Sequence, residues 1–206
     1  VLFRSTKDEW KRIIRAGVRD YWFNKLIAGA ITKSSLQWLD ITRLRDGSPH
    51  PIWPTNSNIY NVTAASVRAK MLSGTYILQS TRARFNQYSV NQKCHLCGAP
   101  CEDLPHFLCE RPSLSGVRDS VMSRKIVPLL SRLNLTTPTD RRSRCFMILN
   151  GPTYENLGGL INDFSSRSGT RADLVCKLEI VLSDFCFKLH TARSEKLANQ
   201  QKLMAP

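Results

Sequence analysis

The sequence predicts a mostly α-helical chain, with helical bundle-like segments arranged around a small loop rich in cysteine and histidine. Two observations carry this prediction. Capping sequences precede several segments whose apolar residues recur about every 3.6 positions. The stretch from Cys94 to Cys109, called the cysteine-rich loop below, holds four of the seven cysteines and a histidine. With 206 residues, 42% of them hydrophobic, the chain is long and apolar enough to bury a core.

The first predicted part is an N-terminal helical segment, residues 1–50. Thr6 and Glu9 form a capping box, after which apolar residues follow at helical spacing, and Gly29 is expected to end the helix. Residues 34–44, "SSLQWLDITRL", fit a helix or a strand, and the proline-rich residues 45–58 mark a boundary. We expect the apolar stripe of the helix to face the core; it comprises Trp10, Ile13, Ile14, Val18, Tyr21, Trp22 and Leu26.

The second predicted part, residues 58–112, joins a basic helix to the cysteine-rich loop. Apolar and small residues recur at helical spacing between Asn61 and Tyr76. The next segment, "TYILQSTRARFNQYSV", places two cations beside two aromatic rings, a combination that suits backbone contacts and base stacking with single-stranded nucleic acid. The alternative is that both rings face inward and the cations are only solvated. The two cations are Arg82 and Arg84, and the two aromatic rings are those of Phe85 and Tyr88.

The third predicted part, residues 113–206, is a C-terminal helical region. We expect a break or kink near Pro128, a short helix capped by Thr139, and a long helix that begins near Thr170. The polar tail from Ser194 onward is expected to fray. The apolar stripe of the long helix consists of Leu174, Leu178, Val181, Phe185 and Leu189.

The cysteine-rich loop has the spacing of a metal site, Cys94-x2-Cys97-x8-His106-x2-Cys109. A zinc ion takes four thiolate or imidazole ligands at the corners of a tetrahedron. Cys94 and Cys97 can close on one ion through a tight turn at Gly98, and His106 and Cys109 would share one face of a helical turn. Four protein ligands leave no position for water, so the sequence predicts a structural zinc site.

Two alternatives stay open at this loop. Cys101 could replace one of the other thiols as a ligand, and all of these cysteines could instead be buried thiols without a metal. The odd number of cysteines and the lack of a secretory signal argue against a disulfide framework. The three remaining cysteines, Cys145, Cys176 and Cys186, occur among apolar residues and are expected in the core.

The net charge of +14 is unevenly distributed, because no acidic residue occurs between Asp46 and Glu102. A long interval of one sign favours a polyanionic partner, most simply RNA or DNA, over a merely solvated face. A second acid-free interval, residues 141–154, carries three further arginines. The expected phosphate contacts are Arg68, Lys70, Arg82, Arg84 and Lys93.

The compartment follows from what the sequence lacks. No apolar run approaches the length of a membrane span, and the first residues, "VLFRSTKDEW", have no apolar signal-peptide core. We therefore expect no membrane partner and an intracellular protein, in the nucleus or the cytoplasm. The sequence does not begin with Met, so we expect a fragment or a processed piece.

The stretch "SVRAKMLSGTYILQSTRARFNQYSVNQKCHLCGAPCEDLPHFLCERP" resembles the region downstream of the polymerase core in reverse transcriptases of non-LTR retrotransposons. The shared features are a helix ending in "GTY", an "RFN" segment, and a Cys-x2-Cys…His…Cys finger introduced by "ED". The resemblance covers residues 58–112 and, less specifically, residues 170–197. The family's last spacing is commonly His-x3-Cys or longer, which keeps Cys101 as an alternative to Cys109.

The resemblance implies a protein derived from such a reverse transcriptase, with the polymerase portion missing from this chain. No Asp-Asp pair is present to bind catalytic magnesium, so we predict no enzyme activity and no catalytic residues. We expect a zinc-stabilised module that grips template RNA or target DNA and also contacts the missing polymerase portion. The alternatives are a protein-interaction module on a zinc scaffold and a restriction-like endonuclease, for which Asp140, Glu155, Asp163 and Asp173 show no suitable arrangement.

Overall fold

The computed structural model describes residues 6–44, 50–53, 58–85, 89–152 and 168–204. Within these ranges the regular structure is helical and includes no strand, which confirms the predicted fold class. The α-helices are α1 (Lys7–Thr32), α2 (Ile59–Leu72), α3 (Gln79–Arg84), α4 (Ser115–Val121), α5 (Val127–Arg132), α6 (Arg141–Asn150) and α7 (Ser168–Met204). Short 3₁₀ or π turns link them: η1 (Ser34–Leu36), η2 (Ile41–Leu44), η3 (His106–Glu110), η4 (Pro112–Leu114) and η5 (Met122–Ile126).

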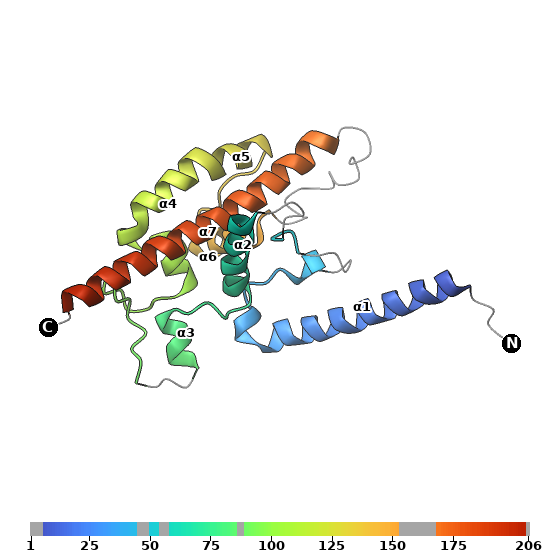
Figure 1. The fold of residues 1–206 in the computed structure, drawn as a ribbon, viewed down its shortest axis with the longest axis horizontal. Helices are drawn as coiled ribbons and strands as arrows, with labels where there is room; N and C mark the ends of the chain where they lie inside the picture. The colour runs from blue at the N-terminus through green and yellow to red at the C-terminus, as the bar shows by residue number, and fades with distance from the viewer. Residues whose placement is uncertain (1–5, 45–49, 54–57, 86–88, 153–167, 205–206) are drawn as a thin grey trace.

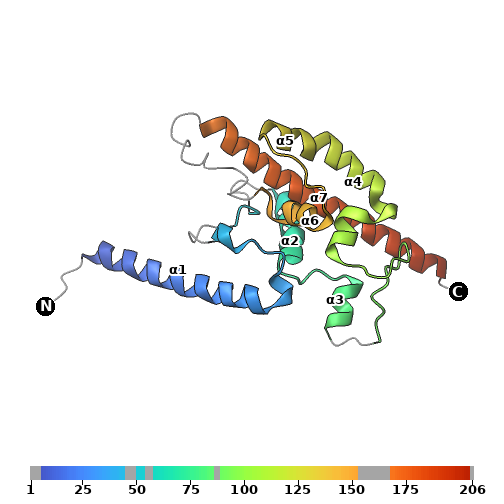
Figure 2. The same cartoon turned by 180° about the vertical axis from the view of Figure 1, so that it is seen from behind.

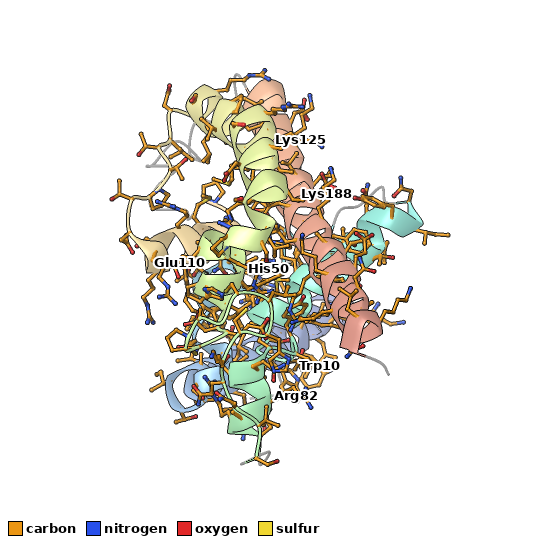
Figure 3. The ribbon with its side chains drawn as sticks, turned by 90° about the vertical axis from the view of Figure 1, so that its left-hand side faces the viewer. Trp10, His50, Arg82, Glu110, Lys125 and Lys188 are labelled. Carbon is orange, nitrogen blue, oxygen red and sulfur yellow. The ribbon has the colours of Figure 1, made fainter. Side chains whose placement is uncertain are left out.

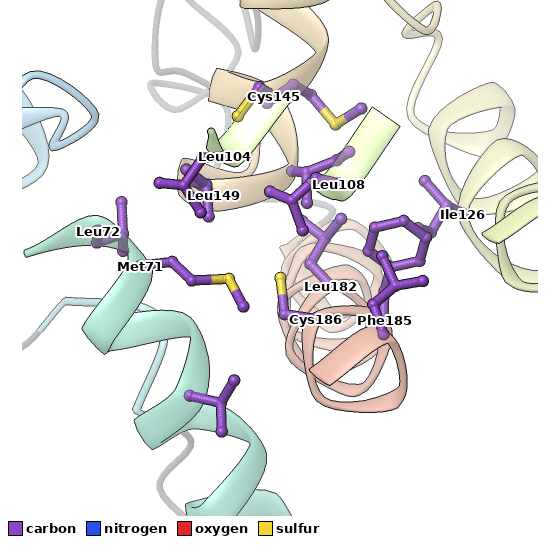
Figure 4. Close-up of a cluster of buried hydrophobic side chains, with 14 of the residues drawn as sticks. Met71, Leu72, Leu104, Leu108, Ile126, Cys145, Leu149, Leu182, Phe185 and Cys186 are labelled. Atoms are coloured by element: carbon purple, nitrogen blue, oxygen red, sulfur yellow. The ribbon is translucent and has the colours of Figure 1, made fainter. Parts of the chain in front are cut away.

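The long helix α7 is the centre of the body of the molecule. It packs against α2, which crosses it, and against α4 and α5, which run along it (Figure 1). Its apolar stripe is buried as predicted at Leu174, Leu178, Phe185 and Leu189, while Val181 is half-buried and Leu182 is fully buried. Figure 4 shows side chains of α7 gathered with those of α2 and of the cysteine-rich loop in this core.

One hydrophobic core joins residues from all three predicted parts. It contains Trp38 from the first part, Met71 and Phe107 from the second, and Leu182 from the third. The boundary expected between residues 112 and 113 therefore does not separate two cores. Because burial of apolar surface is the main favourable contribution to folding, the cysteine-rich loop and the C-terminal helices stabilise each other.

Helix α1 differs from its prediction. It has no buried residue, and the apolar stripe expected in the core is instead exposed except at half-buried Leu26, with Trp10 57% and Trp22 65% accessible. The helix extends away from the body in both views (Figures 1 and 2). Its periodicity correctly predicted a helix, capped by the Thr6 hydroxyl, which accepts a hydrogen bond from the Glu9 amide. None of the described helices has the length and apolar character of a membrane span.

Several predicted boundaries also change. Helix α1 passes Gly29 and ends at Thr32, and residues 34–44 form two 3₁₀ turns rather than one helix or strand. Asp140, not Thr139, caps α6, because its carboxylate accepts a hydrogen bond from the Ser143 amide at 2.8 Å. The break or kink expected near Pro128 takes the form of a π segment, η5, which ends two residues before the proline, and the chain stays helical from Ser115 to Arg132.

The polar tail does not fray where the sequence predicted it would. Helix α7 continues through Ser194 to Met204. Near its end, the Gln200 side-chain amide donates a hydrogen bond to the carbonyl of His95 at 3.2 Å. The end of α7 is thus attached to the cysteine-rich loop.

Candidate metal centre and basic surface

The first half of the cysteine-rich loop is a tight turn. The Gly98 amide donates to the Cys94 carbonyl at 2.8 Å, and the Cys94 amide donates to the Ala99 carbonyl at 2.8 Å. Gly98 has a φ of +74°, a conformation that is easy only for glycine. The turn that the sequence predicted at Gly98 is therefore present, and it brings Cys97 back toward Cys94.

Three of the four predicted ligands meet in one group. The ligand atoms of Cys94, Cys97 and His106 all lie within 4.8 Å of one another, and the distance from Cys97 Sγ to His106 Nε2 is 3.3 Å. Zinc bonds of about 2.3 Å to sulfur and 2.0–2.1 Å to nitrogen, at tetrahedral angles, place such a pair roughly 3.5 Å apart. The three side chains thus fit a single metal ion.

Two carboxylates lie beside His106. Asp103 Oδ1 accepts a hydrogen bond from its backbone amide at 2.8 Å. Glu110 Oε2 lies 3.8 Å from Nδ1 of its ring, on the side away from Nε2, which lies 3.3 Å from Cys97 Sγ. Burial, reinforced by the charge of Arg111, lowers the pKa of His106, which favours the neutral ring that metal binding requires. A carboxylate behind a ligating histidine is a common arrangement in metal sites.

Cys109 lies outside this group, which corrects the predicted ligand set. The predicted ligand set requires an α-helical turn, but His106–Glu110 is a π turn, closed by the Arg111 amide, which donates to the His106 carbonyl at 2.9 Å. The wider turn moves the position three residues after His106 off its face. The Cys109 side chain instead packs against the core, and burial raises its pKa to about 11.

The alternative ligand Cys101 also lies outside the group. Its Sγ is half-buried and lies 3.7 Å from Gln92 Oε1. Burial, followed by the charge of Asp103, raises its pKa. Within the part of the chain that the structure describes, the group therefore offers three ligands and not the predicted four.

Glu102 anchors the cysteine-rich loop to the helices. Its side chain is 1% exposed and accepts hydrogen bonds from Arg193 of α7 at 3.0 and 3.1 Å, from Arg111, and from the Gln79 amide at the start of α3 at 3.0 Å. Burial by itself raises the pKa of Glu102, but the hydrogen bonds and charge of Arg193, with the charge of Arg111, outweigh it and lower the pKa. The loop, α3 and α7 are thus joined through one ionised carboxylate.

Arg68 is not available to a phosphate, so its prediction as a nucleic-acid contact is wrong. It is fully buried, and its Nη1 donates to Glu179 Oε2 at 2.8 Å while its Nε donates to the Leu149 carbonyl at 2.9 Å. Arg43 Nη1 donates to the other oxygen of Glu179 at 2.9 Å. The carboxylate that pairs with Arg68 belongs to Glu179 of α7, which is 111 positions away in the sequence. The absence of acidic residues near Arg68 in the sequence therefore did not predict that Arg68 lacks an ion pair.

The other predicted cations lie at the surface. Lys70, Arg82, Arg84 and Lys93 are exposed, and Figure 3 shows Arg82 at the opposite end of the view from Lys125 and Lys188. Phe85 is 60% exposed, so its ring is accessible. Tyr88 lies outside the described residues. Lys70, Arg84 and Lys93 have no ion pair with any carboxylate that the structure describes.

Two arginines that the sequence analysis did not assign to the site lie beside the cysteine-rich loop. Arg141 Nη2 donates to both oxygens of Asp103 at 2.9 and 2.8 Å, and its Nε lies 3.3 Å from Glu110 Oε1. The guanidinium of Arg142 lies 5.5 Å from the centre of the Trp38 ring. Both arginines lie in the second acid-free interval, residues 141–154, which indicated a cationic segment. No local pattern in the sequence indicated that α6 packs beside the cysteine-rich loop.

The carboxylates considered for an endonuclease do not form a metal-binding group among the described residues. Asp140 caps α6 and Asp173 is exposed on α7, while Glu155 and Asp163 lie outside the described ranges.

Comparisons of the chain with family models, curated proteins and solved structures found no match.

Proposed function

We propose that this chain is a zinc-stabilised, non-catalytic nucleic-acid-binding module, the C-terminal portion of a protein derived from a non-LTR retrotransposon reverse transcriptase. The observation that carries the proposal is the juxtaposition of a Cys/His group with exposed cations. Lys93 directly precedes Cys94, and Arg84 belongs to α3, which Glu102 ties to the same loop. Neither cation has a carboxylate partner among the described residues.

The metal in this proposal is zinc, because two thiolates and one imidazole are ligands that zinc prefers. Cys94, Cys97 and His106 would hold the ion, and the bound ion would fix the turn that carries Lys93. A structural zinc ion contributes folding energy and supplies no reaction step. Cys109 or Cys101 is the candidate for a fourth ligand, through a local rearrangement of the loop.

The exposed cations would bind by neutralising phosphates, which gives affinity without base specificity. Lys70, Arg82, Arg84 and Lys93 remain after Arg68 is removed from the predicted set. The partner is a single-stranded stretch of RNA or DNA, since exposed Phe85 offers a ring on which a base can stack. The missing polymerase portion is the further partner of this proposal.

The test is the salt dependence of binding, measured by fluorescence anisotropy with RNA and DNA oligonucleotides of the same sequence. Four phosphate contacts at roughly 0.7–0.9 ion each predict a slope of log affinity against log salt of about −3. Arg82→Ala with Arg84→Ala should flatten that slope by about 1.5. The matched control is Arg124→Ala with Arg132→Ala, two exposed arginines on η5 and α5.

An affinity that is indifferent to salt contradicts the proposal, as does a control pair that weakens binding as much as the α3 pair. Affinity that is indifferent to salt favours a protein-interaction module, and one observation supports that second candidate. The apolar stripe of α1 is exposed, and an exposed apolar patch commonly marks an interaction surface. Replacing Trp10 and Trp22 with serine would abolish binding to a protein partner and leave the salt slope for nucleic acid unchanged.

A further inference from the structure

A cavity of about 660 Å³ lies where four segments that are distant in the sequence meet. Its walls come from residues 34–38 after α1, residues 78–84 around α3, residues 101–105 of the cysteine-rich loop, and the start of α6. A volume of this size is typical of ligand sites. It is lined by polar side chains together with the rings and apolar side chains of Trp38, Leu78, Leu104 and Pro105.

The lining of this cavity is cationic. Three guanidinium groups, those of Arg84, Arg141 and Arg142, face one carboxylate, that of Asp103. Asp103 is already paired with Arg141. Arg84 Nη1 donates a long hydrogen bond of 3.4 Å to Ser34 Oγ, and Arg142 lies over the Trp38 ring. Two of the three cations therefore lack an anionic partner among the residues that the structure describes.

The walls of the cavity are held in place by close contacts between the segments that form them. Gly74 has a φ of +67°, and a Cβ there would come within 2.8 Å of the Ser35 Cα, so the segment after α2 lies directly against η1. Ser80 Oγ donates to the Glu102 carbonyl at 2.7 Å, which joins α3 to the cysteine-rich loop. A site whose walls are already ordered loses little conformational freedom when a ligand binds.

We propose that this cavity binds the sugar–phosphate backbone of single-stranded nucleic acid, with Arg84 and Arg142 each holding a phosphate. The inference rests on the proposed function and names its principal contact site. The planar guanidinium donates two parallel hydrogen bonds to a phosphate, and the Trp38 ring holds Arg142 from one side. Phe85, which follows Arg84 directly, exposes its ring at the edge of α3, which favours a nucleotide over an acidic peptide.

The first experiment compares the double variant Arg84→Gln with Arg142→Gln against the matched control Arg124→Gln with Arg132→Gln, in the full chain. Both pairs remove two exposed positive charges. Loss of two phosphate contacts should flatten the salt slope by about 1.5 for the cavity pair, with RNA and DNA oligonucleotides as the probes. The control pair should keep the wild-type slope. Circular dichroism establishes that both variants are folded.

The second experiment uses Cys101, which lines the cavity and lies outside the Cys94–Cys97–His106 group, after Cys101→Ser has been shown to keep the metal content of the wild-type chain. Its modification by a small thiol reagent is followed by peptide mass spectrometry. The internal control is Cys176 of α7, which was expected in the core with Cys145 and Cys186 but is exposed, unlike those two. A bound oligonucleotide should slow modification of Cys101 several-fold and leave Cys176 unchanged. The Arg84 and Arg142 double variant should lose this protection at the same oligonucleotide concentration.

The outcomes separate the cavity from the broader proposal. Salt-dependent binding with an unprotected Cys101 and an unchanged slope in the cavity variant would overturn the cavity assignment and leave the nucleic-acid proposal standing. Absence of any nucleic-acid binding by the wild-type chain would overturn both. Protection of Cys101 by a polyglutamate peptide but not by either oligonucleotide would assign the cavity to an acidic protein segment, against this inference.

Discussion

Helices α1 and α7 are the two longest helices in the described structure. The apolar residues of α7 are mostly buried, whereas those of α1 are mostly exposed. Helix α7 buries Leu178, Leu182 and Phe185 completely. Helix α1 buries none of its residues, although its sequence has the clearer separation of an apolar and a basic face. The difference shows that apolar periodicity predicts a helix and which of its faces favours burial. It does not predict whether another element of this chain packs against that face.

The two helices also differ in how they treat charge. Glu179 of α7 is 4% exposed and is paired with Arg43 and Arg68, whereas Asp20 of α1 meets Arg19 at the surface at 3.2 Å. Burial raises the pKa of Glu179, but the charges of Arg68 and Arg43 outweigh it and lower the pKa. A buried pair depends on both partners, and an exposed pair is screened by water. We therefore expect substitutions on α7 to change stability much more than those on α1.

The largest effect is expected from Phe185→Ala in the centre of α7. The ring is fully buried, so its removal should lower the free energy of unfolding by about 3–5 kcal/mol, through lost burial and the cavity that remains. Urea denaturation followed by circular dichroism measures the change. A loss below about 1 kcal/mol would mean that α7 is not the centre of the core.

The next effect is expected from Glu179→Gln, which removes the carboxylate that Arg68 pairs with and leaves Arg43 with Asp40, whose Oδ2 lies 3.9 Å from its Nε. Removing one member of a buried ion pair costs roughly 3 kcal/mol or more. The matched change on α1 is Asp20→Asn, which should have no measurable effect. The same urea titration applies to both variants, and equal effects would show that the Glu179 network is not buried.

A pH titration should give a somewhat smaller effect through His50, which is 8% exposed. Burial, followed by the charge of Arg68, lowers its pKa to about 4 from an ordinary 6.5. Between these values the unfolded chain binds a proton that the folded chain does not, so stability falls as the pH is lowered through this window. The interval from the ordinary pKa of 6.5 down to pH 5 is about 1.5 pH units. It corresponds to a loss of roughly 2 kcal/mol in the free energy of unfolding between pH 7 and pH 5.

His50→Asn is the variant that isolates this effect. The asparagine oxygen can accept the hydrogen bond that His50 Nδ1 accepts from the Ile52 amide at 3.2 Å, but asparagine does not titrate. The loss of stability between pH 7 and pH 5 should therefore be smaller in the variant than in the wild-type chain. An identical loss in both would assign the pH dependence to other groups.

The smallest effect on stability is expected from Trp10→Ala on α1. The side chain is 57% exposed, and surface substitutions commonly change stability by less than about 0.5 kcal/mol. The measurement is again urea denaturation, at two protein concentrations. A loss comparable to that of Phe185→Ala, or one that shrinks on dilution, would show that the α1 stripe is covered in solution.

The sequence predicted the features that depend on neighbouring residues. It gave the helical class, the Thr6 cap, the α7 stripe and the turn at Gly98, all of which the described structure contains. Contacts between distant residues were not predictable in this way. The pairing of Arg68 with Glu179 lies across 111 positions, and no local pattern selects one glutamate at that separation.

The metal ligands illustrate the same limit at short range. The spacing predicted that Cys94, Cys97 and His106 come together, and they do. It failed for Cys109 because His106–Glu110 forms a π turn. In a π turn the carbonyl bonds the amide five positions on, not four, so the face that a residue occupies depends on packing around the turn. Arg118 Nη1, for example, donates to the Cys109 carbonyl at 2.9 Å.

The most direct test of the account is a count of bound metal in the purified chain and in three cysteine variants. We predict one zinc ion per wild-type chain, with most of it lost in Cys97→Ser, because Cys97 belongs to the three-ligand group. Cobalt substitution adds a tetrahedral absorption spectrum whose thiolate charge-transfer intensity counts the sulfur ligands, and Cys101→Ser and Cys109→Ser show whether either thiol is the fourth. Far less than one metal ion per wild-type chain, or full occupancy in Cys97→Ser, would contradict a metal centre at this loop.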